Sequence, residues 1–436
     1  MQESINVTER MRQDWNRRAQ EDAHYYVAFG RRDQDDEEFF STAEEIYKSL
    51  ETELKRLPAN PNPRSRRALE IGCGPGRLMK PMSRHFGEIH GVDVSDEMIA
   101  KACRNLRNIP HAHPHATTGS DLAPFADDSF DFVYSYAVFQ HIPSRDVVMQ
   151  YLREAHRVLK PGGILRCQLN GLDETAKTYD TWSGVRIAAD EVRNFASSSG
   201  MQLLVLEGAR TQYMWATLRK PSVGIAPKTS GSTRIRRITN AHTGEPVLPA
   251  RGRFASFTVW MEDLPQDCDL VGLQASVGGV PVTASYIGLP ERDGLQQLNF
   301  ILQREMRTGM QPLEILWNGQ RLCPPSTLRV IPQGPMVPHV WTVSDGVNVM
   351  SEDRVMSGSI KVTIEETDHP EQFRARLGDV AVESYDIFCS DPSLPRFEIN
   401  FDVPRDVAPG KQELRMRIGK RELGTIWMEV LETRSN

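Results

Sequence analysis

The stretch ALEIGCGPGRLMKPMSRHFGEIHGVDV, residues 68–94, decides the fold of the N-terminal half of the chain. A short apolar run, Ala68–Ile71, leads into a loop with glycines at positions 72, 74 and 76, and a second apolar run, Ile89–Val94, follows. Glycine at a turn between a strand and a helix lets the backbone approach a ligand closely. We therefore expect a strand, a glycine loop that holds a ligand, a helix through about Phe86 and a second strand.

The alternation of strands and helices continues beyond this stretch. Apolar runs and helical spacing predict, in chain order, a helix near Asp96–Asn105, strands over Ala116–Gly119 and Phe130–Tyr134, a helix over Val147–Leu159, a strand over Ile164–Leu169, a helix over Asp190–Ser199, and strands over Leu203–Leu206 and Tyr213–Leu218. This order is typical of a mostly parallel sheet with helices on both faces. Apolar residues at helical spacing also predict two or more helices before the first strand.

The C-terminal half shows a different pattern, in which short strand-like runs recur between Gly and Pro turns, as in β-sandwiches. This half also repeats itself, because Leu298-Asn299-Phe300 matches Ile399-Asn400-Phe401, and Gly309 and Gly410 open matching segments at the same spacing of 101 positions. We predict an N-terminal helical cap (1–64), an α/β domain (65–222), a linker (223–232) and two all-β sandwich modules (233–335 and 336–436).

Composition narrows the class of protein. The chain has 436 residues, a formal net charge of −6 and six cysteines. An acidic balance gives no reason to expect a nucleic-acid partner. The cysteines show no CxxC spacing, which argues against a zinc site and a disulfide scaffold. Because we find no signal peptide and no apolar stretch long enough for a membrane span, we expect a cytoplasmic protein.

The glycine loop alone does not identify the ligand. Asp93 ends the second strand, where a carboxylate can accept both hydroxyls of a ribose. NAD and S-adenosylmethionine both carry such a ribose. A nicotinamide-type fold normally has its third glycine one position later, where this chain has Arg77, so the spacing favours a different ligand.

Further motifs follow in order. They are Gly119-Ser120-Asp121-Leu122, the strand Ser129–Ser135, Phe139-Gln140-His141-Ile142 and Leu159-Lys160-Pro161-Gly162-Gly163. With the glycine loop and Asp93, this register resembles class I S-adenosylmethionine-dependent methyltransferases, in particular the type 11 branch, over roughly residues 65–220. The resemblance implies a Rossmann-like seven-stranded sheet, S-adenosylmethionine as cofactor and S-adenosylhomocysteine as product.

The resemblance also implies a role for each cofactor-binding residue. In the glycine loop, Gly72, Gly74 and Gly76, with Cys73 between them, would let the backbone approach the amino-acid part of the cofactor, and Glu70 would steady the loop. Asp93 would hold the ribose hydroxyls. The remaining contacts would be Val94 and Met98 around the adenine, Asp121 on the adenine amino group, the Leu122 backbone amide beside the ring, and Ser135 and Tyr136 at the methionine end.

Residues on the acceptor side carry weaker signals. His141 follows the fourth strand and has an ordinary pKa near neutrality, so it is our candidate general base; the alternative is a histidine that packs a helix start or bonds backbone. Tyr25 and Tyr26 are candidates for an N-terminal lid, or else an aromatic staple. Trp182 and Arg186 follow the fifth strand, where acceptor contacts usually lie, and Arg186 suits a carboxylate or phosphate.

Three alternating histidines, His111, His113 and His115, raise the question of a metal site. In an extended segment they share one face. Pro110 and Pro114 interrupt the run, and a polar approach to the third strand explains it equally well. We expect no metal.

The sequence therefore predicts a methyltransferase acting on a small-molecule or saccharide acceptor, at oxygen. One alternative is a catalytically inactive cofactor-binding scaffold, and another is an NAD-dependent enzyme. For the β-modules, which we expect to resemble immunoglobulin-like domains, self-association and contact with a glycan or a protein are the open possibilities.

Overall fold

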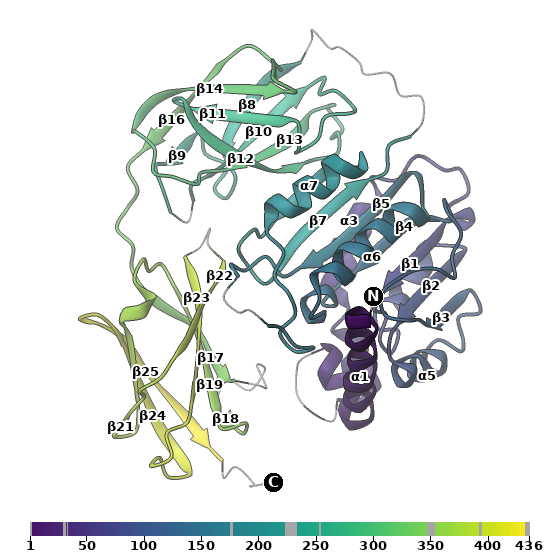
Figure 1. The fold of residues 1–436 in the computed structure, drawn as a ribbon. Coiled ribbons are helices and arrows are strands. Elements are labelled where there is room, and N and C mark those ends of the chain that lie inside the picture. Colours follow the sequence, from purple (N-terminus) through teal and green to yellow (C-terminus); the bar gives the residue numbers. More distant parts are fainter. Residues whose placement is uncertain are drawn as a thin grey trace. The chain divides into compact units, whose positions relative to one another are not determined.

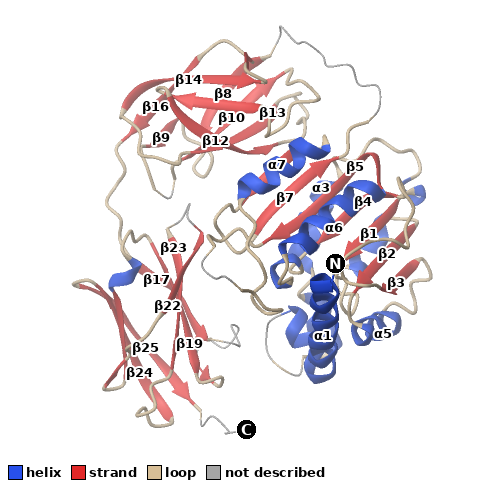
Figure 2. Ribbon diagram, viewed as in Figure 1, coloured by secondary structure: helices blue, strands red, loops and turns tan. Residues whose placement is uncertain are grey.

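The computed structural model describes residues 2–28, 32, 34–174, 178–222, 233–252, 254–346, 354–391 and 395–431 (Figure 1). The chain forms two compact units, one of Met1–Val27 with Asp35–Pro332 and one of Ala28–Gln34 with Gln333–Asn436. Helices and strands alternate in the first part of the chain, and almost only strands follow (Figure 2). The predicted linker over 223–232 lies outside the described residues.

Within the described residues, three α-helices precede the sheet: α1 (Gln2–Ala28), α2 (Asp36–Ser41) and α3 (Glu44–Leu54). Helix α1 bends at Asp22, whose backbone is extended (φ −164°, ψ 90°). The Asp22 carboxylate accepts a hydrogen bond from the Tyr25 amide (3.0 Å) and so caps the second part of the helix. Met11, Ala19 and Ala23 are buried, so α1 packs along one face on the domain. The expectation of two or more helices is confirmed.

A mostly parallel sheet follows. Its strands are β1 (Arg67–Ile71), β2 (Glu88–Asp93), β3 (Ala112–Ala116), β4 (Phe130–Ser135), β5 (Leu159–Leu169), β6 (Gln202–Glu207) and β7 (Met214–Arg219), in the order β3-β2-β1-β4-β5-β7-β6. Strand β7 runs antiparallel to both neighbours. The helices between the strands are α4 (Met79–Met82), α5 (Asp96–Asn105), α6 (Arg145–Val158) and α7 (Ala189–Ser199). The chain leaves β1 toward β2 on one side and returns to β4 on the other. The crevice at this reversal is where ligands bind in such sheets.

Two predicted strands are misplaced. The third strand is not Ala116–Gly119 but β3, and it pairs in parallel with β2 through His90↔His113 and Val92↔His115. It was missed because it carries histidines and Pro114, which an edge strand tolerates. Strand β5 starts at Leu159 rather than Ile164, since the segment expected to be a turn continues the strand, with Gly162 at φ +82°.

The first strand-rich region belongs to the same compact unit as the α/β sheet. Its strands are β8 (Arg234–Asn240), β9 (Val247–Pro249), β10 (Ser256–Glu262), β11 (Leu273–Val277), β12 (Val280–Ile287), β13 (Gln296–Ile301), β14 (Gly309–Trp317), β15 (Gln320–Arg321) and β16 (Ser326–Ile331). Tyr286 of β12 pairs with Val205 of β6, so the α/β sheet continues into this region. The Arg193 guanidinium of α7 donates to the carbonyls of Leu270 (2.8 Å) and Ala284 (3.0 Å). Backbone pairing and a half-buried cation thus join the two parts.

The second unit repeats this strand pattern. Its strands are β17 (His339–Asp345), β18 (Arg354–Val355), β19 (Ser359–Glu365), β20 (Phe373–Leu377), β21 (Val380–Ala381), β22 (Asp386–Asp391), β23 (Arg396–Asp402), β24 (Gly410–Ile418) and β25 (Arg421–Val430). They form the sheets β17-β19-β23-β22 and β18-β25-β24-β20-β21, and side chains of both sheets share one core. The same pairing order occurs in the first region as β8-β10-β13-β12 and β9-β16-β14-β11-β12. The repeat in sequence is therefore also a repeat in strand order.

Candidate functional site

The glycine loop lies between the ends of β1 and β2. All three of its glycines have positive φ: Gly72 +75°, Gly74 +50° and Gly76 +85°. A Cβ on Gly72 would lie 2.2 Å from Cγ2 of Val138, and the Gly72 amide donates to the carbonyl of Val92 (2.7 Å). Any side chain at this position is therefore excluded by both conformation and space.

Glu70 supports the loop from inside the domain. Tyr134 donates its hydroxyl to Oε2 of Glu70 (2.8 Å), and the Met79 amide also bonds to this carboxyl group. Burial raises the pKa of Glu70 to about 8, although these hydrogen bonds and Arg77 oppose the shift. Glu70 thus ties β1 to β4 and to the start of α4, in keeping with the steadying role that we expected.

Asp93 presents the main polar group of the site. Its Oδ2 accepts from the Gly74 amide and its Oδ1 from the Ser95 amide, both at 2.9 Å. Burial raises the pKa of Asp93 to about 6, and hydrogen bonds from the amides of Ser95, Gly74 and Val94 limit that rise. At neutral pH the carboxylate is therefore mostly ionised. A carboxylate has about four acceptor positions, so capacity for a ribose hydroxyl remains beside these amides.

The segment after β3 forms another border of the site. Val94 packs at Gly119, whose added Cβ would lie 2.6 Å from Cγ2 of Val94. Asp121 is half-buried and accepts from the Thr118 hydroxyl (2.9 Å) and the Ala123 amide (3.1 Å). A carboxylate so held still has lone pairs for an amino group.

The Leu122 amide does not face a ligand, contrary to our expectation. It donates to Oε2 of Glu154 (3.0 Å), and the same oxygen accepts from Arg157 (2.8 Å). A side-chain carboxylate that reaches back from α6 gave no signal in the sequence. The Leu122 side chain is buried, so this residue closes the wall by packing.

Ser135 is also held by the protein itself. It is fully buried, and its hydroxyl donates to the carbonyl of Ile71 (2.9 Å), which joins β4 to β1. Tyr136 stacks on Trp215 with ring centres 5.5 Å apart and planes 6° apart. The Ser135 side chain, which we expected at the methionine end of the cofactor, therefore links two strands.

Cys73 and Met98 lie inside the domain. Burial raises the pKa of the Cys73 thiol well above its ordinary value, so the thiol stays neutral. Met98 packs against Ala19 and Ala23, which places it in the core between α5 and α1. Both residues shape the site from behind.

Helix α1 covers this edge of the sheet. Asn16 accepts from the Ser95 hydroxyl (2.7 Å), and Arg12 donates to the carbonyl of Thr117 (2.9 Å). Val27 lies 3.4 Å from the position of a Cβ on Gly74. Helical spacing predicted α1, but nothing in the sequence indicated that Asn16 and Arg12 reach the loops that carry Asp93 and Gly119.

His141 has no free ring nitrogen. Its Nδ1 lies 2.8 Å from the carbonyl oxygen of Trp182, and its Nε2 lies 3.2 Å from Nε2 of Gln140, whose Oε1 in turn accepts from Gln168 (3.1 Å). Burial lowers the pKa of His141 to about 4. A neutral imidazole engaged on both sides is a poor general base at neutral pH. This corrects the role proposed from the sequence and favours the alternative, a histidine that bonds backbone.

An aromatic cluster joins α1 to the segment after β5. The Arg18 guanidinium lies 4.7 Å from the ring centre of Trp15, 5.4 Å from that of Trp182 and 5.9 Å from that of Tyr26. Arg18 is buried and donates to the carbonyl (3.0 Å) and hydroxyl (3.1 Å) of Thr181. Trp182 is 44% exposed. The cluster thus holds α1 against the loop where acceptor contacts were expected.

The other acceptor-side candidates are placed separately. Tyr25 is buried, and its ring meets that of Tyr26 edge-on at 5.1 Å. Arg186 donates to the carbonyl of Asp173, so one arm of its guanidinium is held by backbone.

Two of the alternating histidines contact His90, and the third contacts a backbone carbonyl. His115 and His113 lie on the face of His90, with Nε2 of His115 3.0 Å from Nδ1 of His90. His111 instead contacts the carbonyl of Ser83 (3.0 Å). Among the residues that the structure describes, no group of three or more His, Cys, Asp or Glu side chains is arranged to hold a metal ion.

Comparison with known proteins assigns the domain. Residues 69–167 match the family model described as a methyltransferase domain. The malonyl-[acyl-carrier protein] O-methyltransferase of Enterobacter lignolyticus is 26% identical over 198 residues, 45% of this chain and 73% of that protein. A ubiquinone biosynthesis O-methyltransferase of Roseobacter denitrificans is 33% identical over 139 residues, 29% of this chain and 50% of that protein. The geranyl diphosphate C-methyltransferase structure from Streptomyces coelicolor has 14% identity and a TM-score of 0.35, over 49% of this chain and 97% of that one.

The chain thus contains a class I, S-adenosylmethionine-dependent methyltransferase domain. The alternative of an NAD-dependent enzyme is set aside by this match. The chain spans only half the length of the ubiquinone biosynthesis relative, so the similarity concerns one domain. In the part of the chain that the structure describes, no helix has the length and apolar character needed to cross a bilayer.

Proposed function

We propose that this chain transfers a methyl group from S-adenosylmethionine to an oxygen of a small-molecule acceptor. The observation that carries this is the Asp93 carboxylate, which sits beside the glycine loop, where backbone amides hold it with acceptor capacity left over. A ribose with two neighbouring hydroxyls matches it. The named O-methyltransferase relatives support oxygen as the methylated atom.

The cofactor contacts follow from the geometry. Gly72, Gly74 and Gly76 would lie against the amino-acid part, Asp93 on the ribose, and Val94 and Asp121 around the adenine. The Leu122 amide and the Ser135 hydroxyl would not contact the cofactor, since both are bonded within the protein. Cys73, Met98 and Tyr136 would support the site from behind.

The protein's contribution to the reaction is alignment. S-adenosylmethionine supplies a methyl group on a positively charged sulfur that is already a good leaving group. Helix α1 covers the carboxyl edge of the sheet through Arg12, Asn16 and Val27, which excludes water and fixes the cofactor contacts. His141 would position the Trp182 backbone rather than take a proton.

The acceptor would lie near Trp182 and Tyr26. Their rings are 6.1 Å apart and meet edge-on around the Arg18 guanidinium, and Trp182 keeps 44% of its surface exposed. An exposed aromatic face with a nearby cation suits a flat or anionic acceptor. Tyr25 would support Tyr26 from the core, and Arg186 would order the loop through Asp173.

The test has a binding arm and a transfer arm. Calorimetric titration of the full chain with S-adenosylmethionine and S-adenosylhomocysteine is expected to show both bind. Release of S-adenosylhomocysteine is then measured with panels of hydroxylated aromatic, carboxylated and saccharide acceptors. Absence of binding would overturn the proposal. Binding with no transfer to any panel would favour the scaffold alternative, and transfer only to sugars would select the saccharide acceptor.

For the strand-rich regions we propose two immunoglobulin-like modules, on the strength of their matching strand orders. Module bounds of 233–335 and 336–436, contact with a glycan or protein, self-association and a cytoplasmic location stay predictions. In the second unit Trp341 is 56% exposed and Trp427 is 54% exposed, each beside a cation, Arg396 and Lys411 respectively. A glycan array and a sedimentation measurement would test the two kinds of contact.

A further inference from the structure

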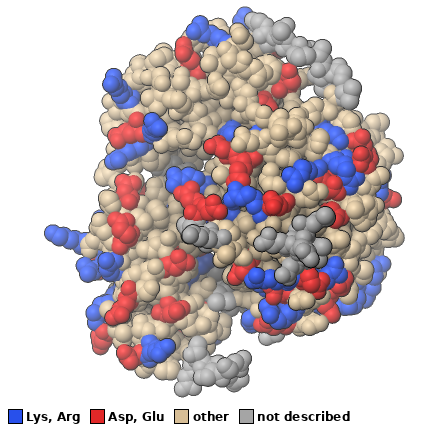
Figure 3. Space-filling view, viewed as in Figure 1, with Lys and Arg blue, Asp and Glu red and all other residues tan. Residues whose placement is uncertain are grey.

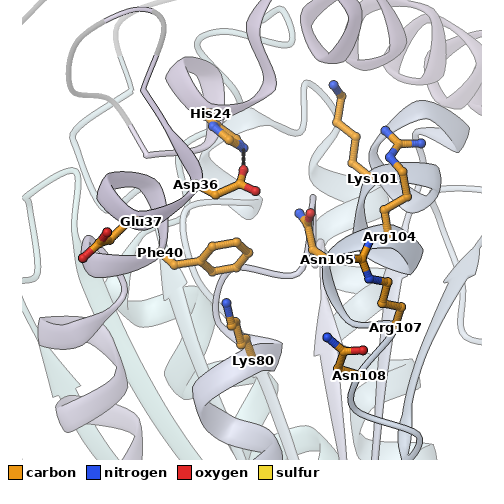
Figure 4. Close-up of a pocket in the computed structure, with 10 residues that line it drawn as sticks. All are labelled: His24, Asp36, Glu37, Phe40, Lys80, Lys101, Arg104, Asn105, Arg107 and Asn108. Carbon is orange, nitrogen blue, oxygen red and sulfur yellow. Dashed lines mark ion pairs between the residues drawn. The ribbon is translucent and has the colours of Figure 1, made fainter.

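A pocket of about 720 Å³ lies between α1, α2, α4 and α5 (Figure 4). None of the residues that we propose to bind S-adenosylmethionine lines it. Its walls are Phe40 of α2, Lys80 of α4 and Asn105 of α5, with His24 of α1 at one end. The volume is in the range of small-molecule sites.

Cations dominate this pocket. Lys80, Lys101, Arg104 and Arg107 line it, against two carboxylates. One of these, Asp36, is engaged by His24 at 3.6 Å.

The cations on the α5 side have no counterion among the described residues. Across the described ranges, no ion pair involves Lys101, Arg104 or Arg107. On the face drawn in Figure 3, by contrast, basic and acidic side chains are interspersed. Like charges that face a shared hollow repel one another, and a bound anion relieves that repulsion.

The end of a helix explains only part of this arrangement. Arg104 lies in the last turn of α5, where cations interact favourably with the carboxyl end of the helix. That account does not cover Lys80, which comes from α4 and lies with its Nζ 4.0 Å from the ring centre of Phe40. It also does not cover Asn105, which faces Phe40 across the pocket (Figure 4). Donors from separate elements therefore converge on one space.

We propose that this pocket binds a small polyanion that carries a diphosphate or triphosphate group. Arginine presents a planar fork that matches phosphate oxygens, and lysine adds a compact charge. Four cations against two carboxylates leave a formal charge of about +2, which offsets part of the charge of about −3 to −4 on such a group. The Phe40 ring offers an apolar wall for an attached organic part. This inference is independent of the proposed transfer reaction.

The pocket adjoins the glycine loop through one residue. The Asn105 amide group donates to the carbonyl of Pro75 (2.9 Å), and Leu106 packs at Gly76, where an added Cβ would lie 2.9 Å from Cδ1. The wall of the polyanion site is thus also a support of the loop.

The experiment is calorimetric titration of the full chain with inorganic pyrophosphate at low salt. The double variant Lys101→Glu/Arg104→Glu is expected to weaken binding by about ten-fold or more. The matched control is Lys420→Glu/Arg421→Glu in the second unit, where both side chains are exposed, and it changes the net charge by the same amount. Binding by the control is expected to stay within about two-fold of the wild type.

Orthophosphate and malonate serve as comparison ligands, and pyrophosphate is expected to bind more tightly than either. Added salt is expected to weaken binding, since exposed charges are screened. No pyrophosphate binding at about 5 mM, equal weakening in both double variants, or tighter binding of malonate would overturn the proposal. If thermal melting shows that the charge reversal unfolds the protein, Lys101→Gln/Arg104→Gln is titrated instead, with the same expectation.

Discussion

Replacing Asp93 with asparagine tests the proposed ribose contact. The carboxylate already accepts from the amides of Gly74 and Ser95, and acceptor capacity remains for a ribose hydroxyl. The side-chain amide of the Asp93→Asn variant would place an NH₂ group opposite one of these backbone amides and would leave a single oxygen to accept. At least one charge-assisted hydrogen bond is lost, at about 1.5–3 kcal/mol. We therefore expect cofactor affinity to fall by about 10- to 100-fold.

The pH dependence makes this prediction sharper. Burial raises the pKa of Asp93 to about 6, and the ionised form is the one that accepts two hydroxyl donors. Affinity is therefore expected to rise with pH through 6, with a loss of about ten-fold between pH 8 and pH 5. The Asp93→Asn variant has no ionisable group at this position and is expected to lose that dependence.

The assay is calorimetric titration with S-adenosylhomocysteine at pH 5, 6, 7 and 8. Asp96→Asn is the matched control, because Asp96 starts the next helix, is exposed and pairs with Arg12 instead (3.1 Å). Thermal melting checks that each variant is folded. Affinity of Asp93→Asn within about two-fold of the wild type, or an unchanged pH profile in that variant, would refute the ribose assignment.

Three other substitutions test separate parts of the domain. Gly72→Ala must place a Cβ 2.2 Å from Val138 and must also adopt φ +75°, so it should lower the free energy of unfolding by about 2–3 kcal/mol in chemical denaturation. The control is Gly200→Ala, where φ is +70° but no atom lies within 4 Å, and it should cost about 1 kcal/mol. Equal losses in the two variants would contradict the clash with Val138. His141→Gln should lower the melting temperature yet leave any pH–rate profile without a change near pH 6.5, and loss of a limb near that pH would restore His141 as a base. Burial lowers the pKa of His90 to about 4, so its neutral form stabilises the fold above pH 6.5. That contribution, about 3 kcal/mol at most, is lost as pH falls toward 4. His90→Gln should flatten this part of the plot of unfolding free energy against pH, and an unchanged slope would contradict the assignment.

Local pattern was sufficient for the central elements of the fold. Helix α5 has the bounds that we predicted, since Ser95 caps it by accepting from the Met98 amide (3.1 Å) and its apolar spacing is regular. Strand β3 was misplaced because its side chains are polar, and its strand conformation depends on pairing with β2. Backbone pairing with a neighbour leaves no signature in the sequence of an edge strand.

The residues of the candidate site show the same difference between what local sequence pattern predicts and what tertiary contacts decide. Asp93 was predictable because the end of an apolar strand beside a glycine loop fixes where its carboxylate points. Leu122 and Ser135 were not, since their partners, Glu154 and the Ile71 carbonyl, come from other elements. The geometry disfavours the general base assigned to His141 for the same reason, because its burial and its bond to the Trp182 carbonyl are set by tertiary packing.

The pairing of Tyr286 with Val205 limits where this chain can be cut into fragments that fold. A gene fragment that ends at residue 222 would encode a sheet whose last strand, β6, has an open edge, together with an Arg193 that has lost both of its acceptors. Open strand edges promote aggregation. A cut after Pro332, where the main segment of the first compact unit ends, keeps this strand pair and both acceptors of Arg193. A fragment that contains the α/β sheet should therefore also contain the first β-region, which supplies the partners of β6 and of Arg193.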